Sequence, residues 1–239
     1  MELNGKVAIV TGASMGIGKT VSIALAKQGV SVALAARTME KLEETKKEID
    51  SFNGRSIIVR TDLEEEAQIL NLFEKTEKEF GRLDILINNA GVTVTGKLID
   101  FSPKDFDRII NINLKAVYLC CQQALKIMVP QKNGVIINIS SNVVYKGYPE
   151  QAIYSGSKCG VLGITKSIAN EHHKDGISVA IIHPGAVDTR LATQARPDID
   201  RSLLIHPEDI ADTVLYMLKL SDNAWVDEMI VRRRSAKPF

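Results

Sequence analysis

Short apolar runs alternate along this chain with longer segments in which apolar residues recur at helical spacing. In chain order the apolar runs are 6–10, 31–35, 56–59, 84–88, 134–140, 178–183 and 226–231. The segments between them carry charged faces, as in 39–52 and 64–80. Strands that are apolar throughout and alternate with amphipathic helices indicate a parallel sheet covered on both faces. The pattern therefore predicts a doubly wound α/β fold with a parallel sheet of about seven strands.

Several helix boundaries are marked as well. Ser102-Pro103 and His206-Pro207 each place a proline at a first helical position, and apolar helices are expected over 103–130 and 152–173. The longest stretch without a clear pattern is 190–206, which predicts an irregular loop of the kind that is often functional. Because no linker or repeat interrupts the chain, we expect residues 1–239 to form a single domain.

Composition excludes several classes of function. The 239 residues are 45% hydrophobic and 25% charged, with a formal net charge of +1, so no strong field favours nucleic acid or an anionic membrane. No apolar run approaches the roughly 20 residues that span a bilayer, and the first residues form no signal peptide. Cys120, Cys121 and Cys159 form no CxxC pair, which favours reduced, buried thiols in a cytoplasmic protein. The histidines have no partners at metal-ligand spacing, so no metal site is predicted.

A glycine-rich turn follows the first apolar run. The sequence TGASMGIG occupies residues 11–18 and leads into a helical pattern. Gly12, Gly16 and Gly18 allow a tight turn and a close backbone approach, and the first amides of the following helix would face an anion. A turn that only joins a strand to a helix would look alike, but the strand–turn–helix context favours a site for a nucleotide diphosphate.

Tyr154 and Lys158 are predicted to be i,i+4 neighbours on one face of a helix. A cation held near a phenol favours the phenolate, so Lys158 is expected to pull the pKa of Tyr154 from about 10 toward neutrality. Such a tyrosine could exchange a proton with a carbonyl oxygen near pH 7. On its own, the pair could equally be an ordinary pair on a helix surface.

Two further polar positions favour a catalytic interpretation of that pair. Ser140 and Ser141 follow an apolar strand, and the carboxyl ends of strands border the ligand crevice of an open α/β sheet. Asn111 and Asn113 lie in an otherwise apolar helical segment, where a buried amide needs hydrogen-bond partners.

Four motifs together identify a family. They are TGxxxGIG at 11–18, NNAG at 88–91, YxxxK at 154–158 and PGAVDT at 184–189. In this order they resemble the short-chain dehydrogenase/reductase family over roughly residues 5–190, and most closely an NADP(H)-preferring carbonyl or 3-oxoacyl reductase. The resemblance implies a Rossmann-like fold with four functional regions. These are a mainly cofactor-binding half (1–95), a catalytic half (96–189), a substrate loop (about 190–206) and a C-terminal helix and strand (207–239).

The resemblance also implies a catalytic set. Tyr154 would be the general acid in reduction and the general base in oxidation. Ser141, and not Ser140, would donate a hydrogen bond to the carbonyl oxygen. Lys158 would lower the pKa of Tyr154 and hold the nicotinamide ribose, and Asn113, favoured over Asn111, would position a water-mediated proton relay to that lysine.

Cofactor contacts carry over by position in the same way. Asp62 is expected near the adenine, although Asp62 or Thr61 could instead cap the helix that follows. The expected cofactor-binding residues are Gly12, Ser14, Met15, Gly16, Ile17, Gly18, Arg37, Thr38, Asp62, Leu63, Asn89, Ala90, Gly91, Tyr154, Lys158, Pro184, Gly185, Val187 and Thr189.

Arg37 bears on the choice of cofactor. It follows the second apolar run, where a dinucleotide fingerprint usually has an acid that holds the ribose, and Ala36 supplies no carboxylate. A guanidinium suits a 2′-phosphate, and Thr38 could add a hydroxyl, so NADP(H) is expected over NAD(H). Met15 stands where the family often has a second basic residue, and Arg37 could instead be a solvated surface arginine.

The remaining arginines are weaker signals. Arg190, Arg196 and Arg201 could attract an anionic substrate or could simply be solvated, and RRR at 232–234 is expected to be a solvated edge or tail after the last strand.

The sequence as a whole predicts a cytoplasmic, homo-oligomeric oxidoreductase, a dimer or a tetramer. It would transfer a hydride between NADP(H) and a ketone, keto acid or 3-oxoacyl substrate, or the matching alcohol. The alternatives are an NAD-linked alcohol dehydrogenase and a non-catalytic NADP(H)-binding sensor or scaffold protein.

Overall fold

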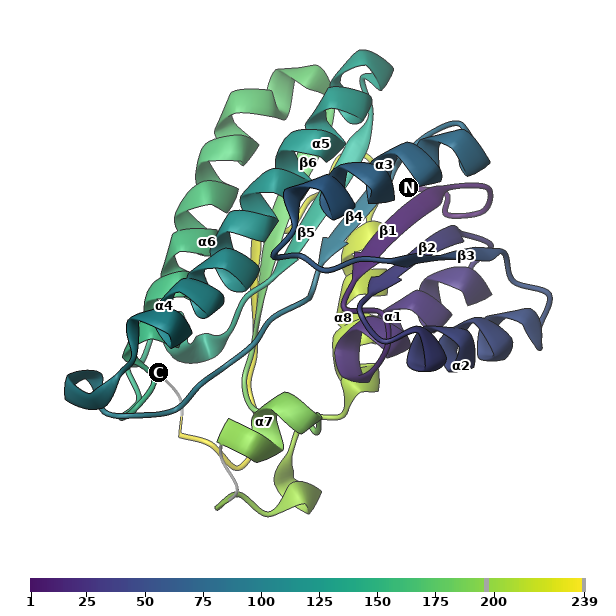
Figure 1. Ribbon diagram of the computed structural model, residues 1–239. Helices are drawn as coiled ribbons and strands as arrows, with labels where there is room; N and C mark the ends of the chain where they lie inside the picture. Colours follow the sequence, from purple (N-terminus) through teal and green to yellow (C-terminus); the bar gives the residue numbers. More distant parts are fainter. Residues whose placement is uncertain (196–197, 238–239) are drawn as a thin grey trace.

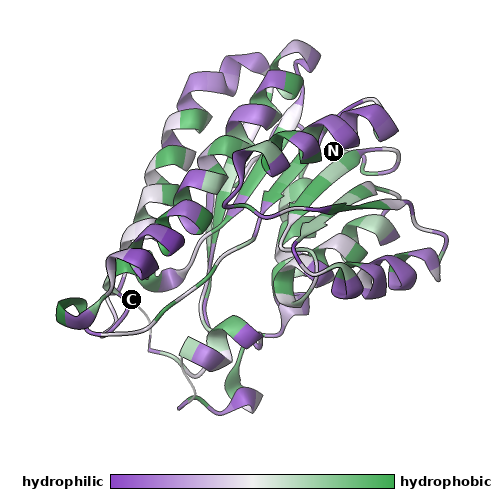
Figure 2. Ribbon diagram, viewed as in Figure 1, coloured by the Kyte–Doolittle hydropathy of each residue, from purple (hydrophilic) through white to green (hydrophobic). Residues whose placement is uncertain are grey.

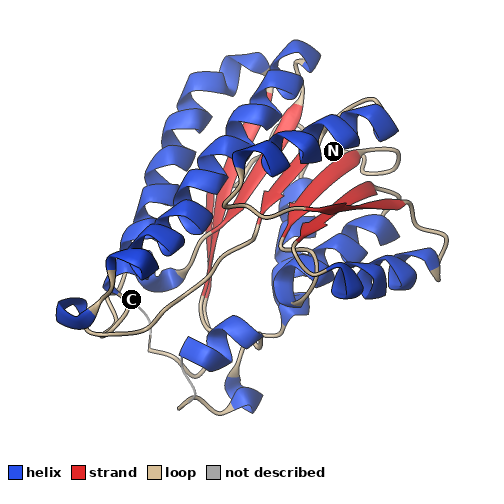
Figure 3. Ribbon diagram, in the orientation of Figure 1, coloured by secondary structure: helices blue, strands red, loops and turns tan. Residues whose placement is uncertain are grey.

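The computed structural model describes residues 1–195 and 198–237. At its centre is a seven-stranded parallel sheet (Figure 3) in the order β3-β2-β1-β4-β5-β6-β7. The strands are β1 (Val7–Thr11), β2 (Ser31–Ala36), β3 (Ser56–Arg60), β4 (Ile85–Asn88), β5 (Gly134–Ile139), β6 (Ile177–Pro184) and β7 (Glu228–Val231). Each predicted strand is present within two residues of its expected bounds, so the predicted sheet is confirmed.

Helices cover both faces of this sheet (Figure 1). The first face carries α3 (Glu66–Phe80), α4 (Pro103–Ile110), α5 (Ala116–Gln131) and α6 (Ala152–His172). The second carries α1 (Gly16–Lys27), α2 (Met39–Asp50) and α8 (Pro207–Leu218), while α7 (Arg190–Ala195) lies apart from both layers. This arrangement is the doubly wound, Rossmann-like fold that the sequence predicts.

The two helix layers explain why the strands are apolar at every position. Along β1, Ala8 and Val10 pack into the core beneath α1, whereas Ile9 packs into the core beneath α3 and α5. Hydrophobic residues accordingly fill the sheet, and hydrophilic residues occupy the outer sides of the helices (Figure 2). A strand with water on one face would instead show alternation.

The predicted helix starts are confirmed. Ser102 caps α4 by accepting a hydrogen bond from the amide of Asp105 at 3.1 Å, and Pro103 is the first helical residue. At α8, Pro207 is likewise the first helical residue, and the amide of the N-cap His206 donates to the carboxylate of Asp209 at 2.9 Å. Proline fits there because the first helical N–H has no partner within the helix.

Three expectations need correction. The helix expected over 103–130 is interrupted by a π-helical segment, Asn111–Lys115, which joins α4 to α5. The loop expected over 190–206 is not irregular throughout, because α7 and a 3₁₀ turn (Arg201–Leu203) lie within it. Cys120 and Cys121 are buried as expected, whereas Cys159 is exposed on α6.

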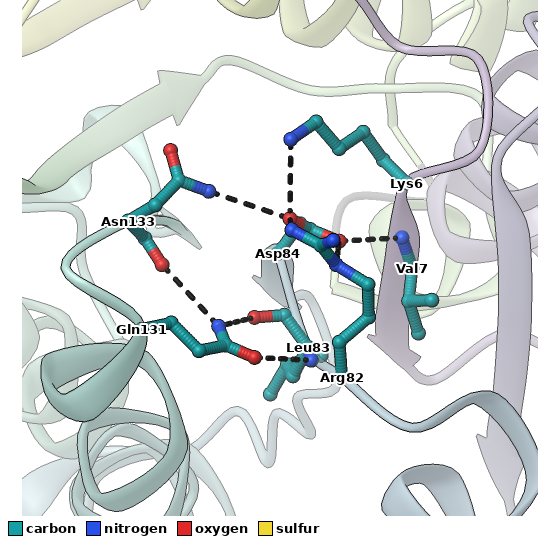
Figure 4. A network of polar contacts seen from close by, with 7 residues as sticks. All are labelled: Lys6, Val7, Arg82, Leu83, Asp84, Gln131 and Asn133. Carbon is teal, nitrogen blue, oxygen red and sulfur yellow. Dashed lines mark hydrogen bonds and ion pairs between the residues drawn. The ribbon is translucent and has the colours of Figure 1, made fainter.

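A buried carboxylate joins the elements at the amino end of the sheet (Figure 4). Asp84 is fully buried and accepts hydrogen bonds from the amide of Val7 at 3.0 Å and from Arg82 at 2.8 and 2.6 Å. Lys6 and Asn133 reach the same carboxylate at 3.3 Å. This network ties the start of β1 to β4 and to the loop before β5. It lies at the amino ends of the strands, opposite the carboxyl ends that border the ligand crevice.

Across the described parts of the chain, no helix combines the length and apolar character that crossing a membrane would require.

Candidate active site

The glycine-rich turn folds so that side chains would not fit at its glycines. Gly12 and Gly16 have φ of +69° and +55°, a region that favours glycine, and a Cβ at Gly18 would lie 2.2 Å from the carbonyl oxygen of Gly12. Met15 is the N-cap of α1 and offers no side-chain cap. The amides of Gly16, Ile17 and Gly18 therefore find no acceptor among the described residues. Free amides at a helix N-terminus are the donors that a diphosphate needs.

This turn opens into a crevice at the carboxyl ends of the strands. The strand order reverses between β1 and β4, which is where doubly wound sheets bind ligands. A cavity of about 600 Å³ lies there. Every predicted cofactor-binding residue except Gly18 lines it, and Gly18 lies behind, packed against Gly12.

At the far end of this cavity lie Arg37 and Thr38. Arg37 is half-exposed, and its guanidinium lies 3.9 Å from the carboxylate of Asp62, which is a weak ion pair. Thr38 is the N-cap of α2, yet its hydroxyl makes no capping hydrogen bond. Both side chains, together with the first amides of α2, are available to an anion.

Asp62 does not cap the following helix, which corrects one of the alternatives considered for it. The N-cap of α3 is Glu65, and Asp62 instead accepts a hydrogen bond from the amide of Glu64 at 3.1 Å. Thr61 does not cap it either, since its hydroxyl bonds to the carbonyl of Val59.

Asn89 braces the floor of the cavity. Its side-chain amide donates to the carbonyl of Thr11 at 2.9 Å, and the Thr11 hydroxyl accepts from the backbone amides of Asn89 and Ala90. These bonds hold the end of β4 against the end of β1, so the NNAG motif keeps the floor of the cavity rigid.

Tyr154 and Lys158 lie on the buried face of α6, and both line the cavity. The ammonium nitrogen of Lys158 lies 5.9 Å from the centre of the Tyr154 ring and donates to the carbonyl of Ile139 at 3.0 Å. Lys158 is only 4% exposed, and burial lowers its pKa to about 8.

The pKa of Tyr154 moves in the direction opposite to the one expected from the sequence. Burial raises it to about 12, and the hydrogen bond with Ser141 offsets only part of that rise. The physical reason is that removing a phenolate from water outweighs the nearby ammonium, which is itself disfavoured by burial. The phenol is therefore protonated at neutral pH.

Ser141 follows the end of β5 and faces the same space as Tyr154. Its backbone is fixed by His183, whose Nδ1 lies 3.3 Å from the Ser141 carbonyl, while His183 Nε2 lies 3.1 Å from Glu228. Ser140 is buried, and its hydroxyl bonds to the carbonyl of Lys158 instead. Of the two serines, only the hydroxyl of Ser141 is close to Tyr154.

Asn113 is fully buried in the π-helical segment, behind the cavity. Its side-chain amide bonds to both backbone groups of Val92, at 2.8 and 2.9 Å, and donates to the hydroxyl of Ser157 at 3.2 Å. A Cβ built on Gly91 would lie within 4 Å of both the Asn113 oxygen and the Lys158 nitrogen. Asn111 shows no such side-chain bonds within the described chain, so the structure distinguishes the two asparagines.

A second, smaller cavity of about 110 Å³ adjoins the first at Ser141 and Tyr154. Arg233 lines it, so the tail 232–234 is not simply solvated as expected. Arg108 and Arg190 line the larger cavity, and the sequence did not predict a place in the site for Arg108. Arg201 forms an exposed ion pair with Asp188, and Arg196 lies outside the described residues. No local pattern distinguishes Arg108 and Arg233 from other surface arginines, so only the fold could reveal them.

Comparison with known proteins agrees with this geometry. The sequence model described as short chain dehydrogenase matches residues 6–200. A 3-oxoacyl-[acyl-carrier-protein] reductase of Thermotoga maritima is 34% identical, over 91% of this chain and 92% of its own. An uncharacterized oxidoreductase of Staphylococcus aureus strain USA300 is 36% identical, over 96% of this chain and 98% of its own. The crystal structure of a metagenomic short-chain oxidoreductase in complex with NADP is 34% identical with a TM-score of 0.86, and the match covers 98% of this chain and 99% of the other. The chain is therefore an oxidoreductase that belongs to the short-chain dehydrogenase family.

Proposed function

We propose that this protein catalyses the reversible reduction of a carbonyl group to a secondary alcohol with NADP(H), acting on a ketone, a keto acid or a 3-oxoacyl compound. One observation carries the proposal: Tyr154 and Ser141 line the boundary between the cavity of about 600 Å³ and the smaller one. A carbonyl at that boundary would reach a proton donor and a hydrogen-bond donor from one side and a cofactor from the other.

The larger cavity suits a dinucleotide. Its turn excludes side chains at Gly12, Gly16 and Gly18 and leaves three amides free for a diphosphate. Lys158 lines the same cavity, where it would hold a ribose hydroxyl. When bound, the nicotinamide supplies the hydride in reduction and accepts it in oxidation.

Tyr154 acts as the general acid in reduction. Its raised pKa keeps the phenol protonated at pH 7, so its proton can pass to the carbonyl oxygen as the hydride adds to the carbonyl carbon. The substrate gains one hydride and one proton and becomes the alcohol. Ser141 donates a hydrogen bond to the same oxygen as charge develops on it.

Lys158 and Asn113 serve the return of the proton. Because burial brings the pKa of Lys158 to about 8, this amine exchanges protons readily near neutral pH. Asn113 holds the loop after β4 and the Ser157 hydroxyl in fixed positions, so it can keep a water path to the lysine open.

We further propose that NADP(H) is preferred over NAD(H). Arg37, the uncapped hydroxyl of Thr38 and the start of α2 offer a cation and several donors to a 2′-phosphate. No carboxylate lies at Ala36 to bind two ribose hydroxyls. The NADP bound to the metagenomic relative supports this choice.

The test is Tyr154→Phe, assayed by NADPH oxidation with keto acids, keto esters, quinones and small ketones. We expect kcat to fall about 10²- to 10⁴-fold, the usual contribution of general acid–base catalysis, while NADPH affinity stays within about threefold. The matched control is Tyr216→Phe, at an exposed tyrosine of α8. Substantial turnover by Tyr154→Phe would overturn the assignment of the acid.

The same assay separates the alternatives. A lower KM for NADH than for NADPH would favour an NAD-linked alcohol dehydrogenase. Tight NADPH binding without turnover on any carbonyl compound would favour a sensor or scaffold protein.

A further inference from the structure

The smaller cavity adjoins the larger one and would stay open to a substrate if a cofactor filled the larger one. The two cavities share Ser141, Tyr154, Gly185, Leu191 and Ala192. At about 110 Å³ the smaller cavity has less than a fifth of the volume of its neighbour, at about 600 Å³. A compact substrate fits it better than a long chain does.

One charge faces this cavity. Arg233 is the only basic side chain among the described residues that line it, the other ionisable side chains there are the phenols of Tyr148 and Tyr154, and none of these residues is a carboxylic acid. Arg233 is half-buried, and its side chain makes no hydrogen bond or ion pair with any residue that the structure describes. An unpaired guanidinium in a half-buried position favours an anionic partner.

The fold brings Arg233 to the cavity and holds its backbone there. β7 pairs with β6 in parallel, so that Val231 lies beside Pro184, and the amide of Gly185 donates to the Val231 carbonyl at 2.8 Å. The chain then turns, with the amide of Ala236 donating to the carbonyl of Arg233 at 3.1 Å.

The neighbouring arginines have different roles. Arg232 turns its guanidinium back onto the tail and donates to the carbonyls of Arg233 and Ala236. Arg234 is exposed and does not line the cavity. Only the middle arginine of the three is left available for a ligand.

We propose that Arg233 binds the carboxylate of a small keto acid, or of the corresponding hydroxy acid, whose reacting carbon lies at Tyr154 and Ser141. A guanidinium holds a carboxylate through two parallel hydrogen bonds, which would orient the substrate as well as bind it. Gln151, buried at the start of α6 without a capping hydrogen bond, offers a second polar contact on the same cavity. This inference rests on the proposed function and narrows its substrate class.

The test compares acids with their neutral esters on the full-length protein. Acetoacetate and 2-oxobutanoate are paired with their methyl esters, and NADPH oxidation is followed for the unmodified protein, Arg233→Gln, Arg233→Lys and the control Arg234→Gln. The unmodified protein should prefer each acid. In Arg233→Gln, kcat/KM for the acids should fall roughly 10- to 100-fold, mainly through KM, because the contact is made equally in the ground and transition states.

The esters and the control give the discriminating results. Arg233→Gln should leave ester reduction within about threefold, Arg233→Lys should keep part of the preference for acids, and Arg234→Gln should change neither. Equal rates on acids and esters by the unmodified protein would overturn the proposal while the proposed function stands. An equal loss on both by Arg233→Gln would do the same, since it would mark a structural effect.

Failure of the proposed function has a different signature. If no carbonyl compound is reduced, binding of 3-hydroxybutyrate to the NADP⁺-saturated protein is measured by calorimetry. Binding that Arg233→Gln weakens by at least tenfold supports the carboxylate site, and binding that is absent or unchanged overturns it.

Discussion

At the scale of single residues, burial sets the protonation of the two groups that would handle the proton. The phenol of Tyr154 keeps its proton at neutral pH because a buried phenolate is costly. The amine of Lys158 loses its proton more easily than a lysine in water does, for the same reason. The folded protein therefore holds a stored acid beside an amine that can exchange protons near neutral pH.

The shifted pKa of Lys158 predicts a pH-dependent stability. Its pKa is about 10.5 in the unfolded chain and about 8 in the folded protein, so between these values the unfolded chain binds more protons and stability rises with pH. Between pH 7.5 and 9.5 we expect the free energy of unfolding of the unmodified protein to rise by about 2 kcal/mol relative to Lys158→Met. Urea denaturation at both pH values measures the difference.

The comparison with Lys158→Met cancels the other groups that titrate in this range. Cys120 and Cys121 act in the opposite direction, since burial raises the pKa of both thiols and stability falls above pH 9. Both proteins share that fall. Parallel curves for the two proteins would contradict an ionisable, buried Lys158.

Arg37 is expected to select NADPH over NADH. Arg37→Asp replaces the cation at the end of β2 by an acid, so the ratio of kcat/KM for NADPH to that for NADH should fall at least tenfold, as expected for the loss of one charge-assisted contact to phosphate. The control is Arg55→Asp, at an exposed arginine that does not line the cavity. An unchanged ratio in Arg37→Asp would remove Arg37 as the selecting residue.

At the scale of elements, the strands and most helices could be predicted because their signals are local. Runs such as 31–35 are apolar on both faces, and Pro103 and Pro207 mark helix starts by their missing N–H. The π-helical segment Asn111–Lys115 could not be predicted, because one extra residue per turn leaves the apolar pattern of 103–130 helical throughout. α7 is only 6 residues long and carries too weak a periodic signal.

Parts of the site escaped prediction for a related reason. The glycine turn and Tyr154 can be predicted because each belongs to a sequence motif. Arg233, in contrast, reaches the cavity only through the register of β7 against β6. A register between distant strands is a tertiary property that local sequence does not encode. The sign of the pKa shift of Tyr154 also depended on burial, which the i,i+4 spacing to Lys158 does not reveal.

The π-helical segment is expected to stabilise the fold through the side chain of Asn113. Asn113→Ala leaves the amide and carbonyl of Val92 and the hydroxyl of Ser157 without their partner, which should lower the free energy of unfolding by about 2–4 kcal/mol. The Asn111 side chain makes no hydrogen bond with any residue that the structure describes, so Asn111→Ala should cost less than about 0.5 kcal/mol. Urea denaturation of both variants tests this, and equal stabilities would contradict the bracing role of Asn113.

At the scale of the whole molecule, the two cavities and the Asp84 network lie at opposite ends of the strands. The carboxyl ends of the strands border both cavities, and the amides of Gly16, Ile17 and Gly18 there find no acceptor among the described residues. The amino ends carry the Asp84 network, in which every polar partner is another part of the chain (Figure 4). A substitution in the Asp84 network should therefore lower stability with little effect on catalysis.

Asp84→Ala tests that separation. Removing the buried carboxylate leaves the amide of Val7 unpaired, whereas Lys6 and Arg82, which are 24% and 45% exposed, can turn to water. The loss should therefore lie near the lower end of the range for a broken buried ion pair, about 3 kcal/mol in the free energy of unfolding. Asp50→Ala, which breaks the exposed pair with Lys46 on α2, should cost less than about 0.5 kcal/mol.

Per folded molecule, kcat/KM should match the unmodified protein in both variants, because the network touches neither cavity. A loss of kcat/KM in Asp84→Ala at a temperature where it is fully folded would show that the amino and carboxyl ends of the sheet are coupled through the strands.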